Sequence, residues 1–304
     1  MSLFLQLCLA LLLDCIFGEP RWIWSRFTHP AVWMGRLVSW CDKIFNHGPV
    51  RILTGGLALF VLIMVALGAG WGITQLGPII TTFVAAILLA QKSLVDHVQA
   101  VAEGLRLSTG EAQRAVSMIV SRDVSQASPS NIARAGLESL AENFSDGVIA
   151  PAFWFLIGGL PAMLVYKMVN TADSMIGYHT PRYEAFGKAS ARLDDILNWV
   201  PARLSAILLL LAGGGLRFWP QVMAEARLHR SPNAGWPEAA MAHSLNYALA
   251  GPRSYQGKVE KYAWINENGL QDLGAKEIDA GVMLIWKAWG IVLVTAGAVV
   301  WSLS

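Results

Sequence analysis

Three carboxylates at helical spacing lie near the middle of the sequence. Glu138, Glu142 and Asp146 follow one another at four-residue intervals, and Asn143 lies among them. On a continuous α-helix these carboxylates form one stripe, where like charges repel unless a cation or a basic partner is present. In nucleotide sites Mg²⁺ takes one or two carboxylates together with substrate phosphates. The pattern therefore favours a Mg²⁺ or nucleotide site, and the alternative is a solvated acidic face that pairs with nearby arginines.

A second group combines a cation, a carboxylate and several hydrogen-bonding side chains within two helical turns. Lys167, Asn170 and Ser174 share one face of a helix, and Asp173 lies three residues beyond Asn170. Such a group beside an apolar segment is suited to holding an anionic substrate at a membrane face, because ionisable groups in a bilayer are costly and are kept for function. The alternative is ordinary capping and hydrogen bonding between helices.

A third group precedes the next apolar run. It contains Arg192, Asp194, Asp195, Asn198 and Arg203. Arg192, Asp195 and Asn198 are three residues apart, so we expect them on one side of a helix. Paired aspartates are common on protein surfaces that have no functional role. Only the position of this group beside an apolar segment favours a function for it.

A fourth segment, Ser231–Glu238, is predicted to open a helix that runs through Ala250. Pro237 suits a first helical turn, and Glu238 complements the positive end of the helix dipole. The free amides of such an end can bind phosphate, although an ordinary cap explains them equally well. The sequence contains no Walker-type phosphate loop, no dinucleotide fingerprint and no serine elbow. Its six histidines and three cysteines lack ligand spacing, so we expect no zinc or haem site and no disulfide framework.

The composition indicates that these groups belong to an integral membrane protein. Hydrophobic residues make up 55% of the 304 residues and charged residues only 14%, against about 25% in soluble domains. The 13 tryptophans are typical of interfacial belts. A net charge of +2 gives no sign of nucleic-acid binding. We predict an all-α, polytopic, single membrane domain over residues 1–304.

Four apolar stretches are predicted to span the bilayer. The clearest has about 22 residues, which at ~1.5 Å per residue is long enough to cross. The first stretch is interpreted as a retained span and not a signal peptide, because no basic region precedes it. The four predicted spans lie near residues 3–17, 52–73, 76–94 and 282–301.

Two further apolar segments are interrupted. Residues 148–166 contain Gly158-Gly159-Leu160-Pro161, and residues 204–216 end in three glycines. Each connection on residues 17–51, 92–147, 167–203 and 217–281 carries at least five Lys or Arg, whereas the turn at 73–79 carries none. The positive-inside rule therefore places every long connection in the cytoplasm, which four spans plus two re-entrant segments would satisfy. Six full spans are the alternative.

Amphipathic helices are expected on the cytoplasmic surface. Leu94, Val98, Val101 and Leu105 recur at helical spacing. Ser108 is predicted to cap a helix toward Val120, and the segment that begins at Ser128 is predicted to cap a helix over residues 132–144.

With these residues in view, the sequence resembles the adenosylcobinamide-phosphate synthases of cobalamin biosynthesis, which are polytopic membrane proteins. The resemblance runs over nearly the whole chain. The chain departs from the usual family sequence at two places. Gly18-Glu19-Pro20 stands where Gly-Asp-Pro is usual, and Ala250-Gly251-Pro252 stands where Gly-Gly-Pro is commoner. Both changes keep charge or turn geometry. The matching stretches are LLLDCIFGEP (11–20), HPAVWMGRL (29–37), SRD (121–123), ESLAENFSDGVIAP (138–151), YKMVNTADSMIGY (166–178), ARLDDILNWVPARL (191–204) and SPNAGWPEAAMA (231–242).

The resemblance implies an activity, a location and partners. Family members join aminopropanol phosphate or ethanolamine phosphate to a propionate of adenosylcobyric acid and consume ATP, which implies Mg²⁺. The expected location is the cell inner membrane with the active site on the cytoplasmic side. The expected partners are adenosylcobyric acid, the amino-alcohol phosphate, the lipid bilayer and other enzymes of the pathway, with no nucleic acid.

Roles follow for the residues in the matching stretches. Glu142 and Asp146 are expected to bind the metal, and Lys167 and Arg192 to face phosphates. Asp173, Asp194 and Asp195 share metal and base roles that the sequence does not separate. The remaining expected substrate-binding residues are Arg122, Asp123, Asn143, Asn170, Ser174, Asn198, Arg203, Asn233 and Glu238.

Two other classes of protein compete with an enzyme. The missing nucleotide motif favours a non-catalytic scaffold or corrinoid-binding protein of the same pathway. Broken helices are typical of transporters, but the charged groups here lie at segment ends and not at a midplane. Only an enzyme would produce the amide from purified substrates.

Overall fold

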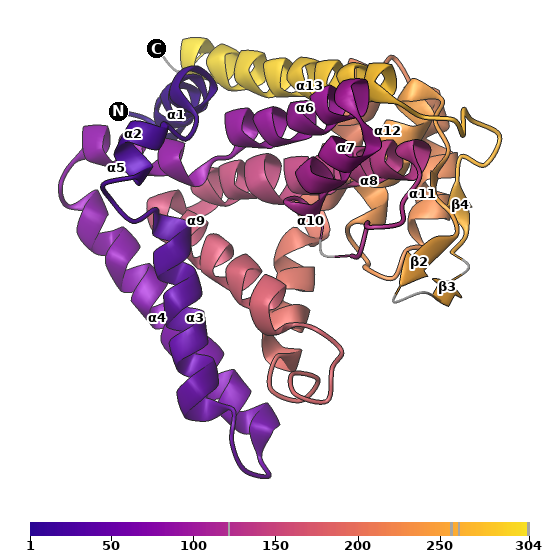
Figure 1. Ribbon diagram of the computed structural model, residues 1–304. Helices are drawn as coiled ribbons and strands as arrows, with labels where there is room; N and C mark the ends of the chain where they lie inside the picture. The colour runs from indigo at the N-terminus through magenta and orange to yellow at the C-terminus, as the bar shows by residue number, and fades with distance from the viewer. Residues whose placement is uncertain (121, 256–257, 261, 303–304) are drawn as a thin grey trace. The chain divides into compact units, whose positions relative to one another are not determined.

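The chain folds almost entirely into helices (Figure 1). This computed structural model describes residues 1–120, 122–255, 258–260 and 262–302. Two compact units divide the chain. The first unit comprises Met1–Ala90, Asp146–Trp199 and Ala296–Ser304, and the second comprises Gln91–Ser145 and Val200–Thr295.

The first unit is built from apolar helices. Its α3 (Pro30–Phe45) and α4 (Arg51–Thr74) pack side by side, and α4 also packs along α9 (Ala150–Ile176) (Figure 1). Its helices are α1 (Leu3–Phe17), α2 (Arg21–Trp24), α3, α4, α5 (Pro78–Leu88), α9 and the start of α10 (Lys188–Ala212).

The second unit combines amphipathic helices with two short pairs of antiparallel strands. In one pair β1 (Leu249–Ala250) lies beside β4 (Trp264–Ile265). In the other β2 (Arg253–Tyr255) lies beside β3 (Lys258–Glu260). Within this unit α6 (Gln91–Leu107) packs on both α7 (Thr109–Ser117) and α8 (Pro129–Phe144). Its helices are α6 (Gln91–Leu107), α7 (Thr109–Ser117), α8 (Pro129–Phe144), the later part of α10 (Lys188–Ala212), η2 (Leu216–Phe218), α11 (Trp219–Ala226), α12 (Gly235–Leu245) and most of α13 (Ala275–Ser302).

Local sequence signals explain where several helices begin. The hydroxyl of Ser108 accepts a hydrogen bond from the Glu111 amide at 3.2 Å, and the hydroxyl of Ser128 accepts one from the Asn131 amide at 3.3 Å. Both caps were predicted and are confirmed. The prediction that the helix after Ser231 runs through Ala250 is wrong. It ends at Leu245, because Asn246 adopts a left-handed conformation with φ 57°.

Two predicted apolar segments differ in detail in the structure. The predicted span 76–94 is interrupted, since α5 ends at Leu88 and the next residue is extended, with ψ 155°, before α6 begins. The apolar run 204–216 is not a separate segment. Its residues 204–212 continue α10, which runs from Lys188 to Ala212 with Pro201 inside, so the third polar group and most of this apolar run share one helix.

The predicted interruption at Gly158-Gly159 is confirmed. Gly158 has φ −143° and Gly159 has φ 65°, so the backbone leaves helical geometry inside α9. A positive φ is tolerated there because glycine has no Cβ.

Five helical stretches in the described residues are long and apolar enough to cross a membrane. A sixth, Leu3–Phe17, is apolar but shorter. The all-helical, multi-pass class is therefore confirmed, while the number of crossings and the re-entrant segments stay predictions. The five stretches are Arg51–Thr74, Pro78–Leu107, Pro129–Ile176, Lys188–Ala212 and Ala275–Ser302.

The contact between α4 and α9 gives a prediction. A Cβ on Gly70 would lie 2.5 Å from the Pro161 Cα, whereas a Cβ on Gly72 would have nothing within 4 Å. We expect Gly70→Val to force the two helices apart and to lower stability by about 1–3 kcal/mol. Thermal unfolding of the protein in detergent measures this effect. Gly72→Val is the matched control, and equal unfolding temperatures for the two variants would contradict the observed packing.

Candidate functional site

A polar cluster in the first unit joins α9, α10 and the turn before α9. One amide group, that of Asn170, lies between two carboxylates. Its Nδ2 donates to Asp194 Oδ1 at 3.2 Å and to Asp146 Oδ2 at 3.5 Å. Asp194 Oδ2 also accepts from Asn198 Nδ2 at 3.0 Å. We call Asp146, Tyr166, Asn170, Asp194 and Asn198 the carboxylate–amide cluster.

Tyr166 closes the cluster on its inner side. Its hydroxyl lies 2.9 Å from Asn198 Oδ1 and 3.1 Å from the Asp146 carbonyl oxygen, and its side chain is fully buried. Asn198 is also buried. Buried polar groups cost free energy unless they are hydrogen-bonded. These bonds therefore fix the amide of Asn198 and, through it, the carboxylate of Asp194.

Helical periodicity explains the geometry of the cluster. Tyr166 and Asn170 lie one turn apart on α9, and Asp194 and Asn198 lie one turn apart on α10. The expectation that Asn198 shares its face with Asp195 is therefore incomplete. Its hydrogen-bond partner is Asp194, because residues four apart stand one above the other. Asp195 is half-buried on the flank of the helix, and Arg192 is exposed.

The third member, Asp146, comes from a π-helical turn, Ser145–Ile149, between α8 and α9. The expected stripe of three carboxylates assumed an unbroken α-helix. That α-helix ends at Phe144, and the wider π turn changes the angular position of the residues that follow. Single π turns are frequent at functional sites.

Charged groups surround this cluster. Lys167 interacts electrostatically with the carboxylates of Asp146 and Glu19. The charge of Asp173 acts on Asp194 from the same helix as Asn170. Room for Asp173 depends on glycine at position 177, where a Cβ would lie 1.9 Å from Asp173 Oδ1. The site thus combines one ammonium group with several carboxylates.

Two residues beside Lys167 were not among the expected site residues. Glu19 and His29 both interact with Lys167. Burial lowers the pKa of the His29 imidazole, the negative charge of Glu19 opposes this shift, and the positive charge of Lys167 adds to it. The signal that could have found them is their place in the stretches GEP (18–20) and HPAVWMGRL (29–37).

On α9 the last of the expected residues is more exposed. Ser174 is exposed, and its hydroxyl donates to the Asn170 carbonyl oxygen at 2.8 Å. This bond leaves the oxygen of the hydroxyl able to accept another hydrogen bond.

The second unit contains a buried ion pair. Arg122 Nη2 lies 2.9 Å from Glu138 Oε2, and the two side chains are 13% and 7% exposed. Glu138 Oε1 accepts from the Ala250 amide at 2.8 Å. Glu138 therefore neutralises an arginine and fixes the turn after β1. Arg122, one of the expected substrate-binding residues, therefore forms a structural ion pair with Glu138.

Two expected residues near this pair make local bonds. The Asn143 amide donates to the Ser139 carbonyl oxygen at 2.9 Å. Asp123 is exposed and accepts from the Ser125 amide at 2.9 Å, and this bond lowers the pKa of its carboxyl group.

A second basic group joins α10 to the start of α12. Arg203 donates to Asn233 Oδ1 at 3.2 Å and lies 4.5 Å from the centre of the Trp236 ring. Buried Glu238 approaches His229, with 3.7 Å between Oε1 and Nε2. The structure thus brings together Arg203 and Asn233, two of the expected substrate-binding residues.

The donor chemistry of the carboxylate–amide cluster fits a hard cation. Asp146 and Asp194 converge on one amide, and carboxylate oxygens are the ligands that Mg²⁺ prefers. No group of three His, Cys, Asp or Glu in metal-binding positions occurs among the described residues. Glu142 is exposed near the end of α8. Its pairing with Asp146 around a metal stays a prediction.

The chain is similar to known proteins over most of its length. Residues 7–285 match the family model "CobD/Cbib protein". Cobalamin biosynthesis protein CobD of Brucella suis biovar 1 (strain 1330) is 46% identical over 315 residues, covering 97% of this chain and 96% of that protein. CobD of Rhizobium meliloti (strain 1021) is 44% identical, covering 95% and 94%. CobD of Rhodobacter capsulatus is 42% identical, covering 98% of each. No solved structure matches the chain.

Proposed function

The chain belongs to the CobD/Cbib family of cobalamin biosynthesis proteins, and from this premise we propose that it catalyses an ATP-dependent amide ligation. It joins aminopropanol phosphate or ethanolamine phosphate to a propionate of adenosylcobyric acid. The product is adenosylcobinamide phosphate. The observation that carries the proposal is the convergence of Asp146 and Asp194 on Asn170, beside Lys167.

The reaction sets two chemical requirements. A carboxylate is a poor electrophile, so ATP phosphorylates the propionate oxygen to give an acyl phosphate and ADP. The amine then attacks the carbonyl carbon, the C–O bond to phosphate breaks, and phosphate leaves. Because the amine is protonated at neutral pH, a base must accept its proton. Phosphoryl transfer itself depends mainly on alignment and on neutralisation of charge.

The carboxylate–amide cluster supplies groups for these tasks. Asp194 accepts the ammonium proton, with Asp173 adding negative charge, and Asn170 and Asn198 hold its carboxylate in place. Lys167 faces a phosphate group, as does Arg192. Asp195 shares the base and metal roles. Ser174 positions substrate through its hydroxyl.

Mg²⁺ bound with ATP would neutralise phosphate charge, and Glu142 and Asp146 are the residues proposed to hold it. In the second unit the proposed substrate-binding residues are Arg122, Asp123, Asn143, Arg203, Asn233 and Glu238.

A product assay tests the proposal. The purified protein, in detergent, is incubated with ATP, Mg²⁺, adenosylcobyric acid and aminopropanol phosphate, and mass spectrometry follows the amide. We expect product only when all components are present. Binding of corrinoid without product would instead indicate the scaffold function, and movement of a substrate across vesicles without product would indicate a transporter.

We further propose that the long basic connections face the cytoplasm and that the turn at Gln75 faces outward. In a cysteine-free background, a membrane-impermeant maleimide is expected to label Gln75→Cys in intact cells. His47→Cys, at the exposed opposite end of α4, is expected to react only after the membrane is permeabilised. Equal labelling of both positions in intact cells would rule out this orientation.

A further inference from the structure

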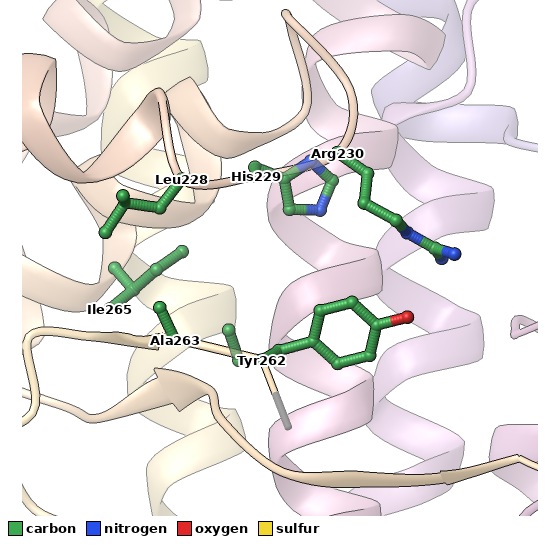
Figure 2. A pocket seen from close by; sticks show the side chains of 7 residues that line it. Leu228, His229, Arg230, Tyr262, Ala263 and Ile265 are labelled. Atoms are coloured by element: carbon green, nitrogen blue, oxygen red, sulfur yellow. The ribbon is translucent and has the colours of Figure 1, made fainter. Parts of the chain in front are cut away.

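A pocket in the second unit has no room for a substrate. Figure 2 shows it between the side chains of His229, Arg230 and Tyr262, and it holds about 20 Å³, enough for one or two water molecules. The feature that bears more directly on the carboxylate–amide cluster lies in the first unit. It is the segment from α9 to α10, residues 177–187, which we call the α9–α10 connection (Figure 1).

The α9–α10 connection joins the two helices whose side chains meet in the cluster. Asn170 lies six residues before the end of α9, and Asp194 lies six residues after the start of α10. At ~1.5 Å per residue, each is only ~9 Å along its helix from the connection. A movement of the connection therefore changes the distance between Asn170 Nδ2 and Asp194 Oδ1, which is 3.2 Å.

Glycines allow the two helices to approach each other at the connection. A Cβ on Gly187 would lie 1.7 Å from the Ile176 carbonyl oxygen, and a Cβ on Gly177 would lie 1.9 Å from Asp173 Oδ1. Neither position has space for a side chain. The backbone contact at Gly187 therefore sets how closely the end of α9 approaches the start of α10.

A buried carboxylate on α3 holds the connection. Asp42 Oδ2 accepts hydrogen bonds from Arg182 Nη2 at 2.6 Å and from the Tyr183 hydroxyl at 3.4 Å. Its other oxygen, Oδ1, accepts from Asn46 Nδ2 at 2.8 Å. Asp42 is buried, whereas Arg182 is exposed. Because a buried carboxylate is costly unless it is paired, Asp42 keeps Arg182, and with it the connection, against the end of α3.

The connection also lies against the start of α4. Arg51 Nη1 donates to the Pro181 carbonyl oxygen at 3.4 Å. Phe186 is fully buried, and a Cβ on Gly55 would lie 2.0 Å from its carbonyl oxygen. The backbone at Phe186 therefore packs where α4 has no side chain. These contacts leave the connection little freedom, and the ion pair with Asp42 adds a charged anchor.

We propose that Asp42 is a positioning residue for the carboxylate–amide cluster. Through Arg182 it fixes the α9–α10 connection, and the connection keeps Asn170 within hydrogen-bond distance of Asp194. This inference rests on the proposed function, because Asp194 is the base of the proposed ligation. A donor and an acceptor about 3.6 Å apart no longer form a hydrogen bond, so a shift of about 0.5 Å breaks this one. Asp42 is enclosed by its own partners and acts through the helices, not on a substrate.

Kinetics of variants on both sides of the ion pair test the proposal in the product assay. A misplacement of about 1 Å can cost about 10²-fold in rate, so Asp42→Asn and Arg182→Ala are each expected to lower kcat at least about tenfold. The KM for ATP should stay close to the wild-type value, because neither residue is proposed to contact the nucleotide. The double variant should lose no more than the more affected single variant, since both changes break one interaction.

Asp279→Asn is the matched control. Asp279 also pairs with an arginine, Arg106, but both side chains are exposed and the pair lies in the second unit. This variant is expected to keep the wild-type kcat. Hydrogen exchange then measures the anchor without any substrate. In Asp42→Asn and in Arg182→Ala, exchange should be faster in the α9–α10 connection and unchanged in α6.

Three results would overturn the proposal. Wild-type exchange of the connection in both single variants would show that the ion pair does not fix it. Faster exchange with a wild-type kcat in both would show that the cluster does not depend on the anchor. Additive losses in the double variant would show that Asp42 does not act through Arg182. If Asp42→Asn fails to fold, Arg182→Ala decides alone, because it removes an exposed side chain.

The exchange measurement separates this proposal from the proposed function. If the wild-type protein makes no amide, the proposed function fails and the positioning role in that reaction fails with it, while exchange still decides whether Asp42 holds the connection. If the wild-type protein makes amide and both single variants keep its kcat, the positioning role fails alone.

Discussion

Replacing Asp194 with asparagine is expected to lower the rate of amide formation by about 10²–10⁴-fold, the usual contribution of a general base. The substitution keeps the size of the side chain and its carbonyl oxygen, which still accepts a hydrogen bond from Asn170 or Asn198. What it removes is the negative charge and the ability to accept a proton. The loss should therefore appear in kcat with the protein still folded. Product formation under saturating substrates measures it.

Asp96→Asn is the matched control for this substitution. Asp96 pairs with Lys92 one turn away on α6, and its side chain is 51% exposed. Exposed pairs of this kind contribute about 0–1 kcal/mol, so the control should keep both stability and activity. A wild-type rate for Asp194→Asn would remove Asp194 from the chemistry.

The second large effect is expected for stability. Replacing Glu138 with alanine should destabilise the protein by about 3–5 kcal/mol, the usual cost of removing one partner from a buried ion pair. Arg122 would keep its charge at a site where its side chain is only 13% exposed, and the Ala250 amide would lose its acceptor. Chemical unfolding followed by tryptophan fluorescence in detergent measures the change.

Two comparisons make the Glu138 result specific. Glu103→Ala removes a carboxylate that pairs with Arg106 while 69% exposed, and it should change stability by less than about 1 kcal/mol. In a double-mutant cycle, Glu138→Ala and Arg122→Ala together should cost clearly less than the sum of the single changes. Additive costs would show that the two side chains do not interact.

Local patterns in the sequence predict much of the fold. The serines that cap α7 and α8 satisfy amides a few residues away, so neighbouring residues are enough to identify them. The break at Gly158-Gly159 is likewise visible in the sequence, since glycine permits the positive φ that the structure shows. The end of α12 was missed because a non-glycine residue, Asn246, takes the left-handed conformation there.

The candidate site was predicted only in part, because it depends on contacts between helices. Sequence spacing identifies Asn170 and Asp194 as polar residues beside apolar segments, but it does not show that one amide links Asp194 to Asp146. It also favoured Asp195 for the shared face, since a spacing of three and a spacing of four are both compatible with one side of a helix. Glu19 lies far from Lys167 in the sequence, and only the tertiary structure brings their charges together.

The proposed ligation requires that oxygen pass from the corrinoid carboxylate to phosphate. Adenosylcobyric acid labelled with ¹⁸O in its propionate carboxyl group, together with ATP and aminopropanol phosphate, tests this with the purified protein. We expect one ¹⁸O atom in the released phosphate for each amide formed, and neither product nor transfer when ATP is omitted. A folded protein that binds the corrinoid, makes no amide and leaves all ¹⁸O in the carboxyl group would contradict the proposed ligation.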